Sequence, residues 1–305
     1  MATFFTEIKR RFYAGTIVAK FISINGGVFI LIRLSIVIFN LFLKQTFFVT
    51  FLEVPSNLEF LIYRPWTIFT YMFVHIDFLH ILFNMLWLYW FGKIFLQFFT
   101  GRQFGGLYVL GGIAGAVFFL LAYNTFPYLK QMAAMSFLAG ASASVMAIVF
   151  AISFYQKNYT INLLLIGPIK LIYLAIGVLI IDVLAITSEN AGGHIAHIGG
   201  ALTGILYAAQ YQKGKDTTKI INRLIDRFVN FFKHKPDFKI HRTKKSFSKQ
   251  NNQPRPGQRE SDEAYLRRKS EENRMIDEIL DKLKHSGYES LSTEEKKRLF
   301  DASKK

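Results

Sequence analysis

The sequence predicts an all-α polytopic membrane protein: a six-transmembrane-helix bundle, then a cytoplasmic tail that contains a small helical hairpin. Hydrophobic residues make up 51% of the 305 positions and the mean hydropathy is +0.25, which excludes a disordered or an ordinary soluble chain. Charge is divided unevenly, because residues 1–212 hold 12 Lys/Arg and 6 Asp/Glu whereas residues 213–305 hold 25 and 15. The membrane domain is therefore predicted to end at residue 212.

Six apolar segments are long enough to approach the roughly 20 residues that a membrane-spanning helix needs. They follow a short N-terminal segment, residues 1–20, and cover residues 21–43, 67–91, 104–122, 139–154, 169–186 and 193–211. Lys9, Arg10 and Arg11 precede a first span that is too long for a cleaved signal peptide.

The distribution of basic residues predicts the orientation of the bundle. An even number of spans puts both termini on one side, and the basic residues before the first span and after the last make that side the cytoplasm. A bacterial plasma membrane is the expected location. Spans two, four and six then run in the same direction, so their first residues lie at a similar shallow depth below the outer surface.

Polar side chains gather at these three outer ends, although such side chains are costly in a membrane and usually mark function. They are His75, Asp77, His80 and Asn84 in span two, Ser142 in span four, and His194 and His197 in span six. A serine hydroxyl becomes nucleophilic when a neutral imidazole takes its proton, so Ser142 and His197 are the predicted catalytic pair. His80 and Asn84 are four residues apart on one helix face and could stabilise an oxyanion, together with the Ser142 N–H.

Small residues would allow spans four and six to approach closely. Gly140 precedes the serine, and Gly200 and Gly204 have the four-residue spacing of close-packed membrane helices. The sequence suggests no acidic third member, since Asp182 in span five has no evident relation to the histidines. The predicted site is therefore a dyad.

Three motifs in this order resemble the rhomboid family of intramembrane serine proteases over residues 60–211. They are His75-x4-His80-x3-Asn84, Gly140-x-Ser142, and Ala196-His197-x-Gly199-Gly200-x3-Gly204. The resemblance implies a rhomboid-like bundle in which Ser142 is the nucleophile, His197 is the general base and then acid, and His80, Asn84 and the Ser142 amide hold the oxyanion. It also implies cleavage of transmembrane segments of other membrane proteins. The chain departs from the family at Ala143, where glycine is usual.

Other interpretations of the same residues compete with this prediction. His75, His194 and Gly140 are expected to support the site structurally. Four histidines could ligate zinc, but HExxH is missing, so neither a metal nor a cofactor is expected. Ala143 motivates a second hypothesis, an inactive rhomboid-like protein that binds and guides membrane-protein clients. A transporter is disfavoured because the polar residues gather near one face of the membrane.

The tail divides into two predicted parts. Residues 213–259 form a basic juxtamembrane segment and linker, with 13 basic and 3 acidic side chains in residues 213–255, which suits anionic membrane lipids. No nucleic-acid partner is expected, because neither a stacking platform nor zinc-finger spacing accompanies the charge. Residues 260–305 form a small helical module with a stop at Gly287 and a capping box at Ser292-x-x-Glu295; its partner is unassigned.

Overall fold

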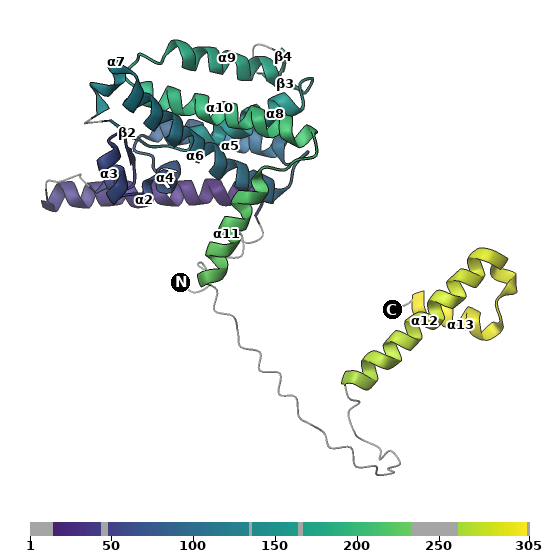
Figure 1. Ribbon diagram of the computed structural model, residues 1–305. Helices are drawn as coiled ribbons and strands as arrows, with labels where there is room; N and C mark the ends of the chain where they lie inside the picture. The colour runs from purple at the N-terminus through teal and green to yellow at the C-terminus, as the bar shows by residue number, and fades with distance from the viewer. Residues whose placement is uncertain (1–14, 44–47, 134–135, 164–166, 233–261, 304–305) are drawn as a thin grey trace. The chain divides into compact units, whose positions relative to one another are not determined.

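The computed structural model describes residues 15–43, 48–133, 136–163, 167–232 and 262–303, so the basic cluster Lys9–Arg11 and most of the predicted linker lie outside the described residues. The chain forms two compact units, Met1–Pro236 and Asp237–Lys305. The first unit is a bundle of helices that run side by side (Figure 1). Its long helices are α2 (Ile17–Leu43), α5 (Phe78–Phe95), α6 (Gly101–Thr125), α8 (Ser142–Tyr155), α9 (Leu171–Leu184) and α10 (Ala191–Gln212).

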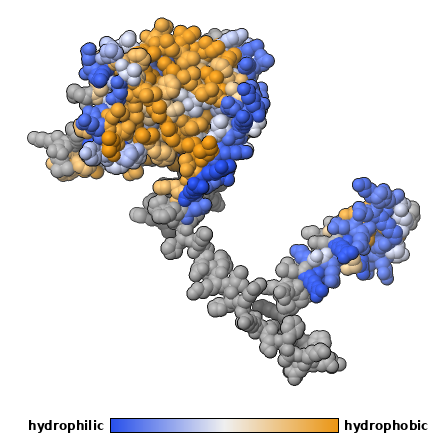
Figure 2. Space-filling view, viewed as in Figure 1, coloured by the Kyte–Doolittle hydropathy of each residue, from blue (hydrophilic) through white to orange (hydrophobic). Residues whose placement is uncertain are grey.

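The surface and the helix lengths identify an integral membrane protein. Among the described residues, α2, α5 and α6 are long and apolar enough to cross a membrane, and α8 and α9 are shorter apolar helices. Figure 2 shows a broad hydrophobic face on this unit, with hydrophilic residues toward both ends of the bundle. Leu31, Leu41 and Phe42 of α2 are exposed on this unit, which is the expected state of side chains that face lipid.

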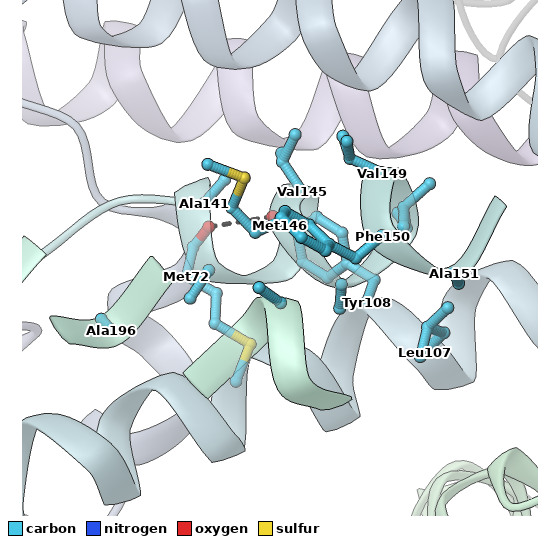
Figure 3. Packing of buried hydrophobic residues seen from close by; sticks show 14 of the residues in the cluster. Met72, Leu107, Tyr108, Ala141, Val145, Met146, Val149, Phe150, Ala151 and Ala196 are labelled. Carbon is cyan, nitrogen blue, oxygen red and sulfur yellow. Dashed lines mark hydrogen bonds between the residues drawn. The ribbon is translucent and has the colours of Figure 1, made fainter. Parts of the chain in front are cut away.

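Helix α8 forms the centre of the bundle. Apart from three serines its sequence is hydrophobic on every face, and 11 of its 14 residues are buried against α5, α6, α9 and α10. Figure 3 shows its side chains Val145, Val149 and Phe150 in the packed interior, which also contains Leu107 and Tyr108 of α6. The residue at its first position is Ser142.

Glycines let α6 and α10 approach α8 closely. A Cβ added to Gly200 of α10 would lie 2.1 Å from the carbonyl oxygen of Ala143, and one added to Gly204 would lie 2.3 Å from that of Ala147. A Cβ at Gly111 of α6 would lie 2.3 Å from the Cβ of Ala147. These approaches are too close for any larger residue, which explains the four-residue spacing of small residues in the sequence.

Two of the predicted spans differ from the helices that form. Span two, predicted over residues 67–91, is interrupted: α4 (Thr67–Thr70) and η2 (Tyr71–Phe73) are followed by a non-helical stretch, and α5 begins only at Phe78. Span four was predicted to begin at residue 139, but Gly140 has φ +120, which no helix accommodates, so α8 begins at Ser142.

The first unit also contains two short antiparallel strand pairs, so it is not purely α-helical. β1 (Val54–Pro55) pairs with β2 (Phe137–Leu138), and β3 (Thr160–Leu163) pairs with β4 (Gly167–Lys170). The first pair ties the segment that leads into α8 to the connection between α2 and α5. That connection also holds η1 (Val49–Phe51) and α3 (Leu58–Tyr63), and α7 (Pro127–Lys130) follows α6.

Within the predicted basic segment, residues after the last span form a further helix, α11 (Thr218–Phe232), which contacts α6. Asp226 forms an ion pair with Arg102, and the Asn222 amide donates to the Arg102 carbonyl at 3.1 Å. Basic residues four positions apart, Lys219, Arg223 and Arg227, lie on one face and apolar residues on the other, which makes this helix amphipathic.

The second unit contains α12 (Asp262–Ser286), η4 (Tyr288–Ser290) and α13 (Thr293–Ser303). Gly287 has φ +74 directly after α12. At the start of α13 the Ser292 N–H donates to a Glu295 carboxylate oxygen at 2.7 Å and the Glu295 N–H donates to the Ser292 hydroxyl at 3.3 Å. Lys282 of α12 lies 3.0 Å from the same carboxylate, and α12 and α13 therefore contact each other.

Candidate active site

Ser142 lies at the N-terminus of α8, directly after a loop that other elements hold in place. Gly140 has φ +120, and a Cβ there would lie 2.7 Å from Cε1 of His80, so the imidazole of His80 rests against the loop backbone. The Ala141 N–H donates to Nε2 of the buried His75 at 3.3 Å. The two residues before the serine are thus fixed by two histidines.

The non-helical stretch that carries His75 is itself anchored on both sides. The Gly140 N–H donates to the Tyr71 carbonyl at 3.0 Å, which joins the serine loop to the first residue of η2. The Arg33 side chain of α2 donates to the Ile76 carbonyl at 3.4 Å. His75 therefore belongs to a loop and not to the same helix face as His80 and Asn84.

Ser142 and His197 open onto one small cavity of about 170 Å³. Asn84 of α5 lines it as well, so three of the predicted residues meet there from three helices. The remaining lining residues are apolar and come from α5, α8 and α9: Phe83, Trp87, Val145, Met146 and Val178. The cavity combines a hydroxyl, an imidazole and an amide in hydrophobic surroundings.

The other predicted residues contact this group without forming a single cluster. The Asn84 amide donates to the His80 carbonyl at 2.9 Å, one turn earlier in α5, and retains a second N–H. The His75 and His80 rings meet edge to face with centroids 5.0 Å apart. His194 lies one turn before His197, and their ring centroids are 5.9 Å apart.

Asp182 of α9 is the site residue that the sequence analysis missed. Its Oδ1 lies 2.8 Å from Nδ1 of His197 and 2.8 Å from Nδ1 of His194. The side chain is 5% exposed, and those of His194 and His197 are 20% and 18% exposed. The six-residue connection between α9 and α10 was the available signal, because it brings the last turn of α9, with Asp182, beside the first turn of α10, with His194.

Among the residues that the structure describes, the same three side chains could hold a metal ion, since their ligand atoms lie within 4.8 Å of one another. Both imidazole nitrogens instead lie at hydrogen-bond distance from one carboxylate oxygen, a geometry that N–H donation explains directly. The cluster therefore has two chemical interpretations, and an experiment can separate them.

Ala143, the departure from the family pattern, points away from the cavity. Its Cβ lies 2.5 Å from where a Cβ on Gly115 would be, so the methyl group packs into the space left by that glycine of α6. Ala143 is buried, and the described cavity lining does not include it. The extra methyl is therefore accommodated by α6 and does not fill the space next to Ser142.

The membrane domain matches a known protein family. Residues 63–213 match the Rhomboid domain, and this stretch contains Ser142, His197 and Asp182. The chain belongs to the rhomboid family. A relative described as RHOMBOID-like protein 12, mitochondrial, from Arabidopsis thaliana is 29% identical over 209 residues, which cover 65% of this chain and 59% of that protein. This rhomboid thus spans less than two thirds of that relative.

The second unit has a separate match. Residues 260–305 match a family of unknown function (DUF6576). This rhomboid therefore joins a membrane domain to a small helical module that has its own family.

Proposed function

We propose that the chain is an intramembrane serine endopeptidase that cleaves transmembrane segments of other membrane proteins with a Ser142–His197 dyad. One observation carries the proposal: the hydroxyl of α8 and the imidazole of α10 open onto a single cavity, which Asn84 of α5 also lines. Membership of the rhomboid family supports the same activity.

The reaction follows from these groups. The Ser142 hydroxyl attacks the scissile carbonyl carbon while His197 takes its proton, and His197 then returns the proton to the leaving amine. The developing oxyanion is held by the Asn84 amide, by His80 and by the Ser142 N–H, which lies at a helix N-terminus where amides lack intrahelical acceptors. Water then attacks the carbonyl carbon of the acyl-enzyme ester while His197 takes its proton. His197 returns that proton to the Ser142 oxygen as the ester bond breaks and the new carboxyl terminus is released.

The length of α8 supports a site below the membrane surface. Its 14 residues extend about 21 Å, less than the roughly 30 Å of a hydrocarbon core, whereas α6 and α10 have 25 and 22 residues. In a six-span bundle formed by α2, α5, α6, α8, α9 and α10, the N-terminus of α8 then lies inside the outer leaflet. Both chain termini are cytoplasmic in this proposal.

Substrates are proposed to enter between α5 and α9. Phe83 and Trp87 line the cavity from α5, and Val178 lines it from α9, so separating these helices opens the cavity toward lipid. A substrate helix must unwind locally at the cleavage point, because its scissile carbonyl is otherwise hydrogen-bonded within the helix. The expected membrane is the bacterial plasma membrane, while the Arabidopsis relative carries the description mitochondrial.

The alternative function is that of an inactive protein that guides membrane-protein clients. Ala143 motivated it, and the packing of its methyl against Gly115 weakens that motive. Labelling of Ser142 by a serine-directed phosphonate separates the two functions, because only an activated hydroxyl reacts.

Cleavage of a panel of tagged transmembrane segments by the purified protein in detergent tests the proposal. We expect Ser142→Ala to reduce cleavage at least about 1,000-fold and to abolish phosphonate labelling. Ser144→Ala is the matched control, since Ser144 is buried on the same helix and retains full activity in this proposal. Equal cleavage by the wild type and Ser142→Ala, or no labelling of the wild type, would refute the proposed function.

A further inference from the structure

The carboxylate of Asp182 on α9 points into the bundle, whereas the residues on either side of it in the sequence are exposed. Asp182 is 4% exposed, whereas the adjacent Ile181 and Val183 are 63% and 50% exposed. A carboxylate within an apolar helix is costly and is retained when it has partners and a task. The proposed dyad mechanism leaves this group without a task.

Its partners are the proposed catalytic base and one further histidine. Nδ1 of His197 and Nδ1 of His194 each lie 2.8 Å from Oδ1 of Asp182. The two histidines are three residues apart on α10, so they share the helix face that meets α9. A carboxylate oxygen has two lone pairs and can accept both N–H donors.

We propose that Asp182 is a positioning residue that fixes the tautomer and ring orientation of His197, so that the site operates as a triad with the acid on α9. The inference rests on the proposed function. A neutral imidazole that donates through Nδ1 has its lone pair on Nε2, which is the form a general base requires. When the ring takes the serine proton, the adjacent carboxylate stabilises the resulting positive charge.

His194 has a separate part in this arrangement. His194 lies one helical turn before His197 on α10. By donating to the same oxygen of Asp182, it holds the carboxylate in place. His194 is not among the residues that line the described cavity, whereas His197 is. His194 therefore orients the acid, and the acid orients the base.

The first measurement compares Asp182→Asn with the wild type. The amide has the same shape as the carboxylate but lacks its charge, and it can turn its NH2 group toward Nδ1 and favour the wrong tautomer. We expect kcat to fall at least about 100-fold while KM stays within about threefold, with thermal unfolding measured to confirm a folded variant. A kcat within threefold of the wild type would overturn the inference, because a packing role tolerates an isostere.

The second measurement uses the wild-type protein and does not depend on the folding of a variant. In protein with ¹⁵N-labelled histidine at pH 8, the His197 signals, assigned by their loss in His197→Gln, should show a protonated Nδ1 and an unprotonated Nε2. The opposite tautomer would overturn the inference. Loss of wild-type activity in a chelator, restored by Zn²⁺, would overturn it in favour of a metal bound by the three side chains.

The two proposals fail in distinguishable ways. A wild type that neither cleaves nor reacts with the phosphonate removes the proposed function. A wild type that cleaves, with an equally active Asp182→Asn variant, removes the triad and leaves the dyad.

Discussion

The contact between α8 and α10 can be tested by adding a single methyl group at Gly200. In Gly200→Ala the new Cβ would lie 2.1 Å from the carbonyl oxygen of Ala143 and 2.8 Å from its carbonyl carbon. This approach is about 1.3 Å closer than the 3.4 Å of ordinary contact. Both atoms belong to the backbone, so no side-chain rotation relieves the clash and the helices must separate.

The size of the effect follows from two opposing terms. Alanine favours a helix by about 1 kcal/mol over glycine, whereas overpacking costs about 1–3 kcal/mol and lies at the upper end when backbone must move. We expect net destabilisation of about 1–2 kcal/mol, or about 2–8 °C in Tm. Because Ser142 and His197 sit on the separated helices, a displacement of about 1 Å should reduce cleavage about 100-fold.

Thermal unfolding and cleavage of the same reporter, both in detergent, measure these effects. Gly177→Ala is the matched control, because Gly177 lies within α9 and a Cβ there meets nothing within 4 Å. That variant should keep its activity and unfold at the same or a higher temperature. Wild-type Tm and activity in Gly200→Ala would refute the close approach of α8 and α10.

Three further predictions concern the surroundings of the site. Burial raises the pKa of Glu53 from 4.5 to about 7, so between these pH values the folded state holds a proton that the unfolded chain releases, and the free energy of unfolding falls as the pH rises from about 4.5 to 7. Glu53→Gln should remove this pH dependence and add up to about 3 kcal/mol to the free energy of unfolding at pH 8. The same dependence of Tm on pH in the variant and the wild type would contradict this role. Gly115→Ala should destabilise the protein by about 1–3 kcal/mol, and Ala143→Gly should recover part of that loss in a double-mutant cycle; additive effects would contradict the contact. His75→Ala should leave the Ala141 N–H without its acceptor, cost about 1–3 kcal/mol and slow phosphonate labelling, whereas wild-type labelling and Tm would exclude this role.

The sequence was sufficient to predict residues whose chemistry is local or repeats along a helix. The apolar segments, the polar side chains of spans two, four and six, and the spacing of Gly200 and Gly204 are all properties of short stretches of chain. They led to the rhomboid resemblance, which the match over residues 63–213 bears out. The roles of Ser142 and His197 remain proposals.

The residues at which α5 and α8 begin could not be predicted from composition. The break before Phe78 and the start of α8 at Ser142 depend on a loop that Tyr71, Arg33 and His75 hold through long-range hydrogen bonds. Hydropathy does not distinguish such a loop from the first turn of a span, because both are rich in apolar residues.

The sequence by itself therefore determined that the chain enters a membrane and which polar groups are available for chemistry there, since both follow from side-chain type and helical period. Only the tertiary structure decided that Asp182 meets His194 and His197, and that the Ala143 methyl occupies the space beside Gly115. These pairings depend on how far one helix is rotated and shifted against another, and that geometry is set by the packing of the whole bundle.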